Sequence, residues 1–330
     1  MTISELKRLR PSAFSGVFRI RRPFRCMSGN GSAYLACLLE DMSGTMKAFA
    51  WPERYRGPMA FSDLERVAVT GKLCVLRHGT VIHLHTIEIV QAEQSSLTAL
   101  IPRSLCPLPH LLDKLQATVA AIGNPALRNF ASNVLADDSI AFPLVSLPAS
   151  RSHHHCHAGG LLEHSLACAS MVGRYREFSQ PVLDLGIVGA LFHDVGKIKT
   201  VRAGGHQDAA WYVLNHDDLT LEVLAPHLKR LETSCRDAAT ALRYIWTWRR
   251  SSNRSRIPLM TVAEAVALAD RVSAGLDAEK QAFHDRPDWQ RFARFGRSAL
   301  HWRPNLAQTE ADNMDCITPF RQKQFVGGQP

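Results

Sequence analysis

The hydrophobic positions of the chain follow two different periods, and the change from one to the other falls near residue 92. Before that point, apolar and polar residues alternate over short stretches such as 32–39 and 46–51, which a turn sequence at 41–45 separates. Alternation with a period of two, bounded by turn residues, predicts β-strands joined as a hairpin. Further strands are expected at 66–75 and 81–90. About five strands in about 80 residues predict a small closed barrel.

After a polar and proline-rich stretch, apolar residues recur with helical spacing. Helices are expected at 111–122, 127–135, 161–178, 182–192, 219–231, 238–250 and from 261 onwards. Residues 136–151 are expected to form a loop. Thr261 and Glu264 have the spacing of a capping box at the start of the last helix. The stretch at 34–53 resembles the strand–turn–strand of oligonucleotide/oligosaccharide-binding (OB) folds, so the predicted fold class is α+β and multidomain, with an OB-like β-barrel in front of an all-α domain.

The change of pattern also suggests how the chain divides into domains. We expect a basic segment at 1–11, a barrel at 12–92, a linker at 93–109, a helical domain at 110–280, and a basic and aromatic C-terminal segment at 281–330. A chain of 330 residues with 46% hydrophobic and 21% charged residues is typical of a globular protein of two domains.

Composition argues against a membrane or exported protein and favours an anionic partner. No apolar run reaches the length of a membrane span, and the first ten residues lack the apolar region of a signal peptide, so a cytoplasmic protein is expected. The eight cysteines lack CxxC spacing, which favours reduced, mostly buried thiols. The formal net charge of +9 favours an anionic partner, nucleic acid before membrane.

Cationic and aromatic residues gather in the first half of the predicted barrel. They are Arg19, Arg21, Arg22, Phe24, Arg25 and Tyr34. Stacking faces mixed with cations are what binding of single-stranded nucleic acid requires. The alternative is that the aromatic rings fill the barrel core and the arginines are a solvated face. A second basic and aromatic stretch includes Arg249 and Arg250, which could contact a nucleic-acid backbone.

Three separated stretches carry residues that can ligate a metal. His164 lies on one apolar helix, and His193 and Asp194 lie at the end of the next. Asp270 shares a face of the last helix with apolar residues, and a buried carboxylate needs a partner. Two imidazoles and two carboxylates can converge on one divalent cation. His216 is a further candidate ligand, although it could equally be only a neighbour of a helix cap.

A histidine-rich tract at 152–160 directly precedes the helix that carries His164. Such tracts bind metals or are merely solvated, and this one ends in two glycines that allow close backbone approach. Within it, His154 or His155 could act as a proton donor, because an imidazole can supply a proton near neutral pH. Lys197, three residues after Asp194, is suited to a phosphate oxygen or to pairing with an acid.

The sequences GGLLEH and FHDVGKI, followed by Asp270, resemble the H…HD…D signature of HD-domain metal-dependent phosphohydrolases. This resemblance implies a metal held by His164, His193, Asp194 and Asp270, with Mn²⁺, Mg²⁺, Fe²⁺ or Ni²⁺ all feasible. Members with two metals carry further histidines, and His216 fits the first such position. The expected His-His pair reads Ile-Trp-Thr-Trp at 245–248, which favours a single metal.

With the barrel in front, the arrangement resembles the YhaM-type 3′–5′ exoribonucleases, and the histidine tract is also similar to that of MobH/TraI-type relaxases. The first resemblance implies a metal-dependent phosphodiesterase that shortens single-stranded RNA or DNA from the 3′ end. In it a metal-bound hydroxide attacks phosphorus, with Lys197 and nearby imidazoles stabilising the charge. The alternatives are a relaxase-like enzyme, a non-catalytic nucleic-acid-binding protein with a vestigial metal site, and a nucleotide phosphohydrolase. The oligomeric state stays open, with a homo-oligomer among the options.

Overall fold

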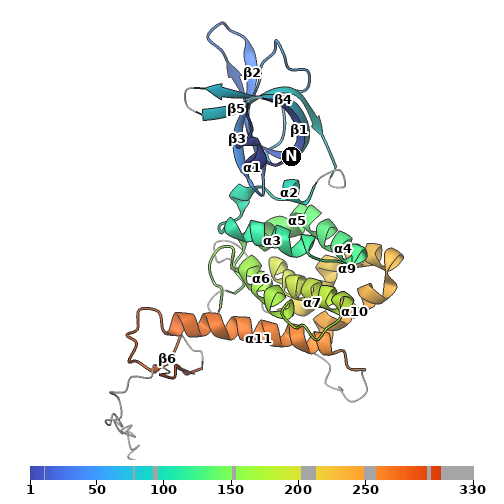
Figure 1. Ribbon diagram of the computed structural model, residues 1–330, viewed down its shortest axis with the longest axis vertical. Helices are drawn as coiled ribbons and strands as arrows, with labels where there is room; N and C mark the ends of the chain where they lie inside the picture. The colour runs from blue at the N-terminus through green and yellow to red at the C-terminus, as the bar shows by residue number, and fades with distance from the viewer. Residues whose placement is uncertain are drawn as a thin grey trace, which may run out of the picture.

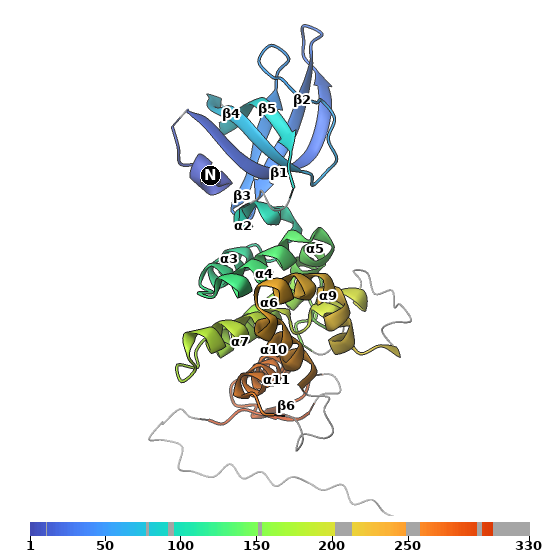
Figure 2. The same cartoon turned by 90° about the vertical axis from the view of Figure 1, so that its right-hand side faces the viewer.

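The structure is a computed structural model that describes residues 1–10, 12–76, 79–91, 96–150, 154–201, 213–248, 258–295 and 299–305. Its two main parts are a barrel at one end of an elongated molecule and a helical domain below it (Figures 1 and 2). Helix α11, Thr261–Ala282, lies on the side of the helical domain that faces away from the barrel.

The barrel is a closed sheet of five strands. They are β1 Ala13–Met27, β2 Ala33–Asp41, β3 Gly44–Ala50, β4 Arg66–Leu76 and β5 Gly79–Ile89. Neighbouring strands follow the order β1-β2-β3-β5-β4, and β4 pairs with β1 to close the sheet. β3 and β5 pair in parallel, while the other neighbours are antiparallel. This arrangement confirms the OB-like barrel that the alternating pattern predicted.

The first residues of the chain close one side of the barrel. Helix α1, Ile3–Leu6, buries Ile3 and Leu6 completely against the barrel core. Asp41, at the end of β2, accepts a hydrogen bond from the Ile3 backbone N–H at 2.8 Å and so fixes the start of this helix. Residues 1–10 are therefore part of the barrel's packing, although their exposed side chains include the cations Lys7, Arg8 and Arg10.

The connection between the two parts is short and packed. It contains α2, Leu97–Leu100, and a 3₁₀ turn, η2, Arg103–Leu105. Leu100 and Ile101 are buried in the core of the helical domain. The described part of the stretch expected as a linker, residues 96–109, thus packs against the helical domain.

The helical domain is built from consecutive helices that pack around one core. They are α3 His110–Ala120, α4 Pro125–Ala136, α5 Asp138–Ser146, α6 Gly160–Val172, α7 Gln180–Phe192, η3 Val195–Lys199, α9 His216–Ser234, α10 Arg236–Thr247 and α11.

Two expectations about this domain are wrong. Helix α5 replaces the predicted loop at 136–151, because Asp137 caps it and Ile140, Ala141 and Leu144 give it a buried face. The predicted capping box is not formed, since Glu264 instead accepts a hydrogen bond from the Trp248 indole at 2.8 Å.

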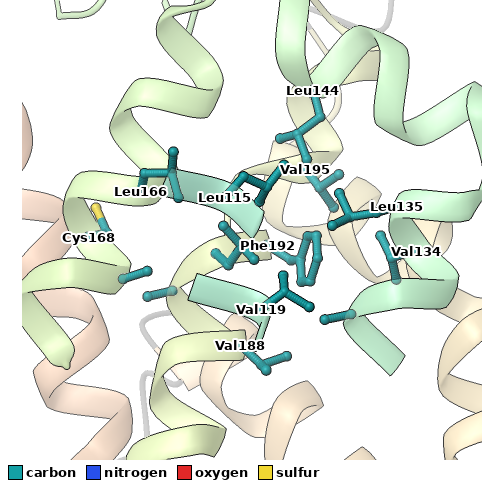
Figure 3. Packing of buried hydrophobic residues seen from close by; sticks show 14 of the residues in the cluster. Leu115, Val119, Val134, Leu135, Leu144, Leu166, Cys168, Val188, Phe192 and Val195 are labelled. Carbon is teal, nitrogen blue, oxygen red and sulfur yellow. The ribbon is translucent and has the colours of Figure 1, made fainter. Parts of the chain in front are cut away.

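The core converges on the end of α7 (Figure 3). Phe192, completely buried, lies among side chains from several helices, including Leu115 of α3 and Leu135 of α4. Its ring meets that of Phe130 edge to face, with centroids 6.1 Å apart. The residues that follow Phe192 are therefore held by the buried core of the domain.

The C-terminal part of the described chain is small. β6, Phe292–Ala293, and β7, His301–Trp302, form a two-stranded sheet, and the guanidinium of Arg303 lies over the Phe283 ring. Among the described residues, no helix has both the length and the hydropathy that crossing a membrane would require.

Candidate metal centre

Four side chains converge near the C-terminal end of α7. They come from α6, from the two residues that directly follow α7, and from α11. His164 of α6 is fully buried, Asp194 follows α7 and is 3% exposed, and His193 and Asp270 lie beside them. The two histidine Nε2 atoms are 3.2 Å apart. From His164 Nε2, Asp194 Oδ2 is 3.4 Å and Asp270 Oδ1 is 3.3 Å away. From His193 Nε2 the same oxygens are 3.4 and 3.7 Å away.

The turn after α7 requires a glycine. A Cβ on Gly196 would lie 2.0 Å from the backbone oxygen of His216 and 2.4 Å from the Thr220 nitrogen, so only glycine allows α9 to pack this closely. Thr220 strengthens the contact, because its hydroxyl accepts from the Gly196 N–H at 3.0 Å and lies 3.0 Å from the His193 carbonyl oxygen. The local sequence thus fixes the direction in which His193 and Asp194 point.

Both histidines are oriented through their other ring nitrogen. Nδ1 of His193 lies 2.8 Å from the Ala190 carbonyl oxygen, and because a carbonyl only accepts, Nδ1 carries the proton. Nδ1 of His164 lies 2.9 Å from the Ser273 hydroxyl. In a neutral His193 ring with Nδ1 protonated, Nε2 presents a lone pair, and the Ser273 hydroxyl, which can donate or accept, fixes the orientation of the His164 ring.

The charges of these groups support one another. Burial lowers the pKa of His193, but Asp194 and Asp270 outweigh it and raise that pKa to about 9. Burial also lowers the pKa of His164, but the same two carboxylates outweigh it and raise that pKa well above its usual value. Burial raises the pKa of Asp194, yet Lys197 and the two histidines hold it well below its usual range. The cluster therefore binds positive charge strongly.

This donor set fits a divalent cation. Ligand atoms about 2.0–2.2 Å from a four-coordinate ion lie about 3.3–3.6 Å from one another. The five separations above range from 3.2 to 3.7 Å. The four ligand atoms form one group of mutually close metal-binding atoms. Two imidazole nitrogens and two carboxylates that face one another need positive charge between them, which ring protons supply in the free protein and a divalent cation would supply by replacing them, so we regard this cluster as the candidate metal centre.

Two of the other predicted residues border the centre. The Lys197 amine donates to Asp194 Oδ2 at 2.6 Å. His216 Nε2 is 3.4 Å from Asp194 Oδ1 and 3.0 Å from Asp217 Oδ1, with the His216 side chain 43% exposed. Both His216 and Asp270 line a small cavity of about 40 Å³ that opens onto the centre, which is enough room for a water molecule.

The two histidines proposed as proton donors also lie close to the centre. The ring centroids of His154 and His155 are 5.0 and 5.4 Å from that of His164. Burial is the largest cause that lowers the pKa of His154 to about 4, and it also lowers the pKa of His155. Both rings are therefore neutral at neutral pH, and their role as acids stays a prediction.

The structure places Arg19 away from any nucleic-acid surface, contrary to the prediction. Only 2% of Arg19 is exposed, and its guanidinium donates to the Leu100 carbonyl at 2.7 and 3.0 Å and to the Asp138 carboxylate of α5. Arg66 contacts the same carboxylate. Arg19 therefore joins the barrel to the helical domain, because a guanidinium this deeply buried needs several acceptors.

The remaining predicted nucleic-acid contacts stay on the barrel surface. Arg22, Phe24 and Arg25 are exposed, whereas Arg21 is partly buried and paired with Asp63 at 2.7 Å. The predicted residues Arg249 and Arg250 lie outside the described residues.

Beside them lies an aromatic surface that contains the predicted Tyr34 and two rings that were not predicted, Phe49 and Trp51. Tyr34 of β2 stacks on Trp51, with ring centroids 4.2 Å apart and planes at 22°. Phe49 of β3 continues the row, with its ring 6.4 Å from that of Trp51. The neighbours of Phe49 along β3, Ala48 and Ala50, point into the barrel core. The alternation at 46–51 contained this signal, because it puts Phe49 and Trp51 on the face opposite the core.

Comparison with known proteins agrees with this geometry. Residues 161–275 match the family model of the HD domain, and this range includes all four candidate ligands. The helical region therefore contains an HD domain, preceded in the same chain by an OB-like barrel.

Similar proteins include the 3′–5′ exoribonucleases YhaM of Oceanobacillus iheyensis, Halalkalibacterium halodurans and Bacillus subtilis. They are 24% identical over 189 residues, 23% over 190 and 21% over 183, respectively. The matches cover 56, 57 and 54% of this chain and 59, 58 and 57% of the relatives. The matched part thus spans less than three fifths of the length of these relatives.

A solved structure of a replication protein A heterotrimer bound to ssDNA is also similar, at 18% identity and a TM-score of 0.21. It covers 26% of this chain and 62% of that chain. The assignment of the barrel rests on its strand order and not on this similarity.

Proposed function

We propose that this protein is a metal-dependent phosphodiesterase that degrades single-stranded nucleic acid from the 3′ end. The observation that carries the proposal is the convergence of His164, His193, Asp194 and Asp270 within an HD domain. The similarity to 3′–5′ exoribonucleases supports the substrate class and the direction. Mixed imidazole and carboxylate ligands favour Mn²⁺, Fe²⁺ or Ni²⁺ over Mg²⁺, which prefers oxygen ligands.

A divalent ion held by these four residues would supply an activated water and polarise a phosphoryl oxygen. The protein's own groups prepare this chemistry. Ser273 and the Ala190 carbonyl orient the two imidazoles, and Lys197 offsets the negative charge of Asp194 and would stabilise a phosphoryl oxygen bound beside it. His154 would protonate the leaving oxygen only after a phosphate anion has raised its pKa from about 4.

The barrel would hold the rest of the strand. Tyr34, Phe49 and Trp51 offer successive stacking faces, and stacking tolerates any base sequence. Lys47, which lies on the same face of β3 as Phe49, and Arg25 of β1 are exposed cations suited to the phosphates. This combination of rings and cations is what a non-specific single-strand surface requires.

The catalytic part is tested with single-stranded RNA and DNA carrying a 5′ label, incubated with Mn²⁺. A ladder of products that shortens from the 3′ end is expected for the wild type, and no products are expected for Asp194→Ala. A distribution of internal cuts would contradict the direction, and undiminished cleavage by Asp194→Ala would contradict the site. A protein–DNA adduct that survives denaturation would favour the relaxase-like alternative.

The binding part is tested with Phe49→Ala. Loss of one stacked base costs about 1–3 kcal/mol, so Kd for a single strand should rise about 5- to 150-fold. Phe292→Ala is the matched control, since Phe292 is 52% exposed but lies on the C-terminal sheet. Equal effects of the two substitutions in a fluorescence anisotropy titration would show that the barrel face is not the binding surface.

A further inference from the structure

A second group of metal-binding side chains lies beside the candidate centre but uses none of its four ligands. His155, His157 and Glu163 offer ligand atoms that all lie within 4.8 Å of one another. They line a cleft of about 610 Å³, and Asp277 of α11 lines the same cleft. The cleft is open enough to admit an ion and water from solvent, whereas the candidate centre opens onto a much smaller cavity.

The distances within this group fit coordination of one ion. Glu163 Oε2 is 3.2 Å from His155 Nδ1 and 3.0 Å from His157 Nε2. Asp277 Oδ1 is 3.9 Å from the same His155 nitrogen. One carboxylate oxygen thus faces two imidazole nitrogens at separations close to those of ligands around a divalent ion.

The hydrogen bonds around His157 favour a lone pair towards Glu163. Nδ1 of His157 lies 3.2 Å from the Ala158 carbonyl oxygen, which only accepts, so this nitrogen carries the proton. In the neutral ring, Nε2 is then an acceptor that faces a carboxylate, which is also an acceptor. Two acceptors at 3.0 Å require a positive charge between them, which either a ring proton or a metal ion provides.

The backbone that carries His155 is held in place before any ion binds. Asp277 Oδ2 accepts from the His155 backbone N–H at 2.7 Å, and the Ala149 N–H donates to the His155 carbonyl at 3.0 Å. A Cβ on Gly160 would lie 2.1 Å from that carbonyl, so the close contact needs glycine at this position. His155 itself has a φ of 44°, which is uncommon outside glycine and reflects these constraints.

The second group uses only one side of the His155 ring, and the other side faces the residues that surround the candidate centre. Nδ1 faces Glu163, whereas Nε2 lies 3.5 Å from the Ser273 hydroxyl, which in turn contacts His164 of the candidate centre. An ion on Nδ1 would therefore be separated from the candidate centre by the imidazole ring and Ser273. Occupation of one site does not require a shared ligand.

We propose that His155 Nδ1, His157 Nε2 and Glu163 Oε2 form a second binding site for a borderline divalent ion such as Zn²⁺, with the fourth position left to water from the cleft. Imidazole and carboxylate ligands suit this class of ion. The ion would join the histidine tract to α6. This proposal is independent of the nuclease activity proposed above.

Equilibrium dialysis of the metal-free full-length protein against Zn²⁺, followed by metal analysis, tests the proposal. The wild type should bind two ions tightly. Glu163→Gln and His157→Ala should each bind one, and Asp194→Ala should also bind one, at the other site. His157 and Glu163 are partly exposed, so both variants should fold, and circular dichroism checks this.

His284→Ala is the matched control, because His284 lines the same cleft with its side chain 72% exposed but belongs to no group of converging ligands. It should bind two ions like the wild type. The proposal is overturned if Glu163→Gln and His157→Ala still bind two ions, or if the wild type binds a single ion that Asp194→Ala abolishes. Loss of an ion in His284→Ala would overturn the assigned ligands.

Discussion

The junction between the barrel and the helical domain contains the buried guanidinium of Arg19, and replacing its partner Asp138 should lower the free energy of unfolding. Asp138→Ala leaves Arg19, which is 2% exposed, with only the Leu100 and Leu64 carbonyls as acceptors. Removing one partner of a buried ion pair costs about 3–5 kcal/mol, because the other charge stays buried. The Asp138 side chain is 40% exposed, so water replaces part of the contact. We therefore expect a loss of about 3 kcal/mol in the free energy of unfolding.

Urea unfolding, followed by far-ultraviolet circular dichroism and tryptophan fluorescence, measures this loss. Asp63→Ala is the matched control, because Asp63 pairs with Arg21 at 2.7 Å but is 48% exposed. Exposed pairs contribute less than about 1 kcal/mol. If Asp138→Ala costs no more than Asp63→Ala, the buried pair does not hold the junction and the reasoning fails.

The same reasoning predicts how the arginines of β1 affect nucleic-acid binding. Arg22 is exposed, so Arg22→Met should reduce the dependence of log Kd on log salt by about 0.7 if it contacts a phosphate of a single strand. Arg19→Met should leave that dependence unchanged, since Arg19 has no exposed surface to offer. Anisotropy titrations at several salt concentrations measure this dependence. If Arg19→Met reduced it as much as Arg22→Met, Arg19 would contact the nucleic acid and the prediction would be wrong.

Three further predictions concern the helical domain. Ser273→Ala removes the partner of His164 Nδ1 and should weaken metal binding about 10- to 100-fold in competition with a chelator; unchanged affinity would refute its orienting role. Gly196→Ala should lower the free energy of unfolding in urea by about 1–3 kcal/mol, because the added Cβ would lie 2.0 Å from a backbone oxygen of α9. Gly275→Ala is the control and should not lower it, because a Cβ there would meet no atom within 4 Å. Burial lowers the pKa of His227 despite a neighbouring carboxylate, so the unfolded chain takes up a proton first as pH falls through about 6.5. Stability should therefore decline below that pH, and less so in His227→Gln; equal slopes would contradict the assignment.

Periodicity predicted the parts of the fold in which one face is buried. The barrel followed from alternation, because a strand with one face in a core must repeat every two residues. Helix α5 was missed because Pro143 and the short apolar run resemble a loop, although Asp137 supplies a cap that stabilises its first turn. The capping box failed because Glu264 has a tertiary partner, the Trp248 indole, which the local sequence does not reveal.

The four candidate ligands were predictable because buried imidazoles and carboxylates on apolar helices need partners. The orienting role of Ser273 was not, since its value depends on a hydroxyl lying 2.9 Å from the ring of a residue 109 positions earlier. Arg19 was wrongly predicted to contact nucleic acid for a related reason. Its neighbours in sequence, Arg21 and Arg22, lie on the surface, and only the packing of α2 and α5 against β1 shows that Arg19 is covered.

The placement of Arg19 bears on how binding and cleavage would cooperate. A processive exonuclease needs a fixed distance between the surface that holds the strand and the centre that cuts it, because a drifting domain would misplace the 3′ end. In this chain the connection is packed, with Leu100 and Ile101 in the helical core, and Arg19 and Arg66 of the barrel share the carboxylate of Asp138. Binding energy gained on the barrel would then position the strand at the centre instead of being lost to domain motion. For the exonuclease activity proposed above, weakening the junction should lower processivity on long strands before it lowers cleavage of the shortest ones, which would reach the centre without contacting the barrel.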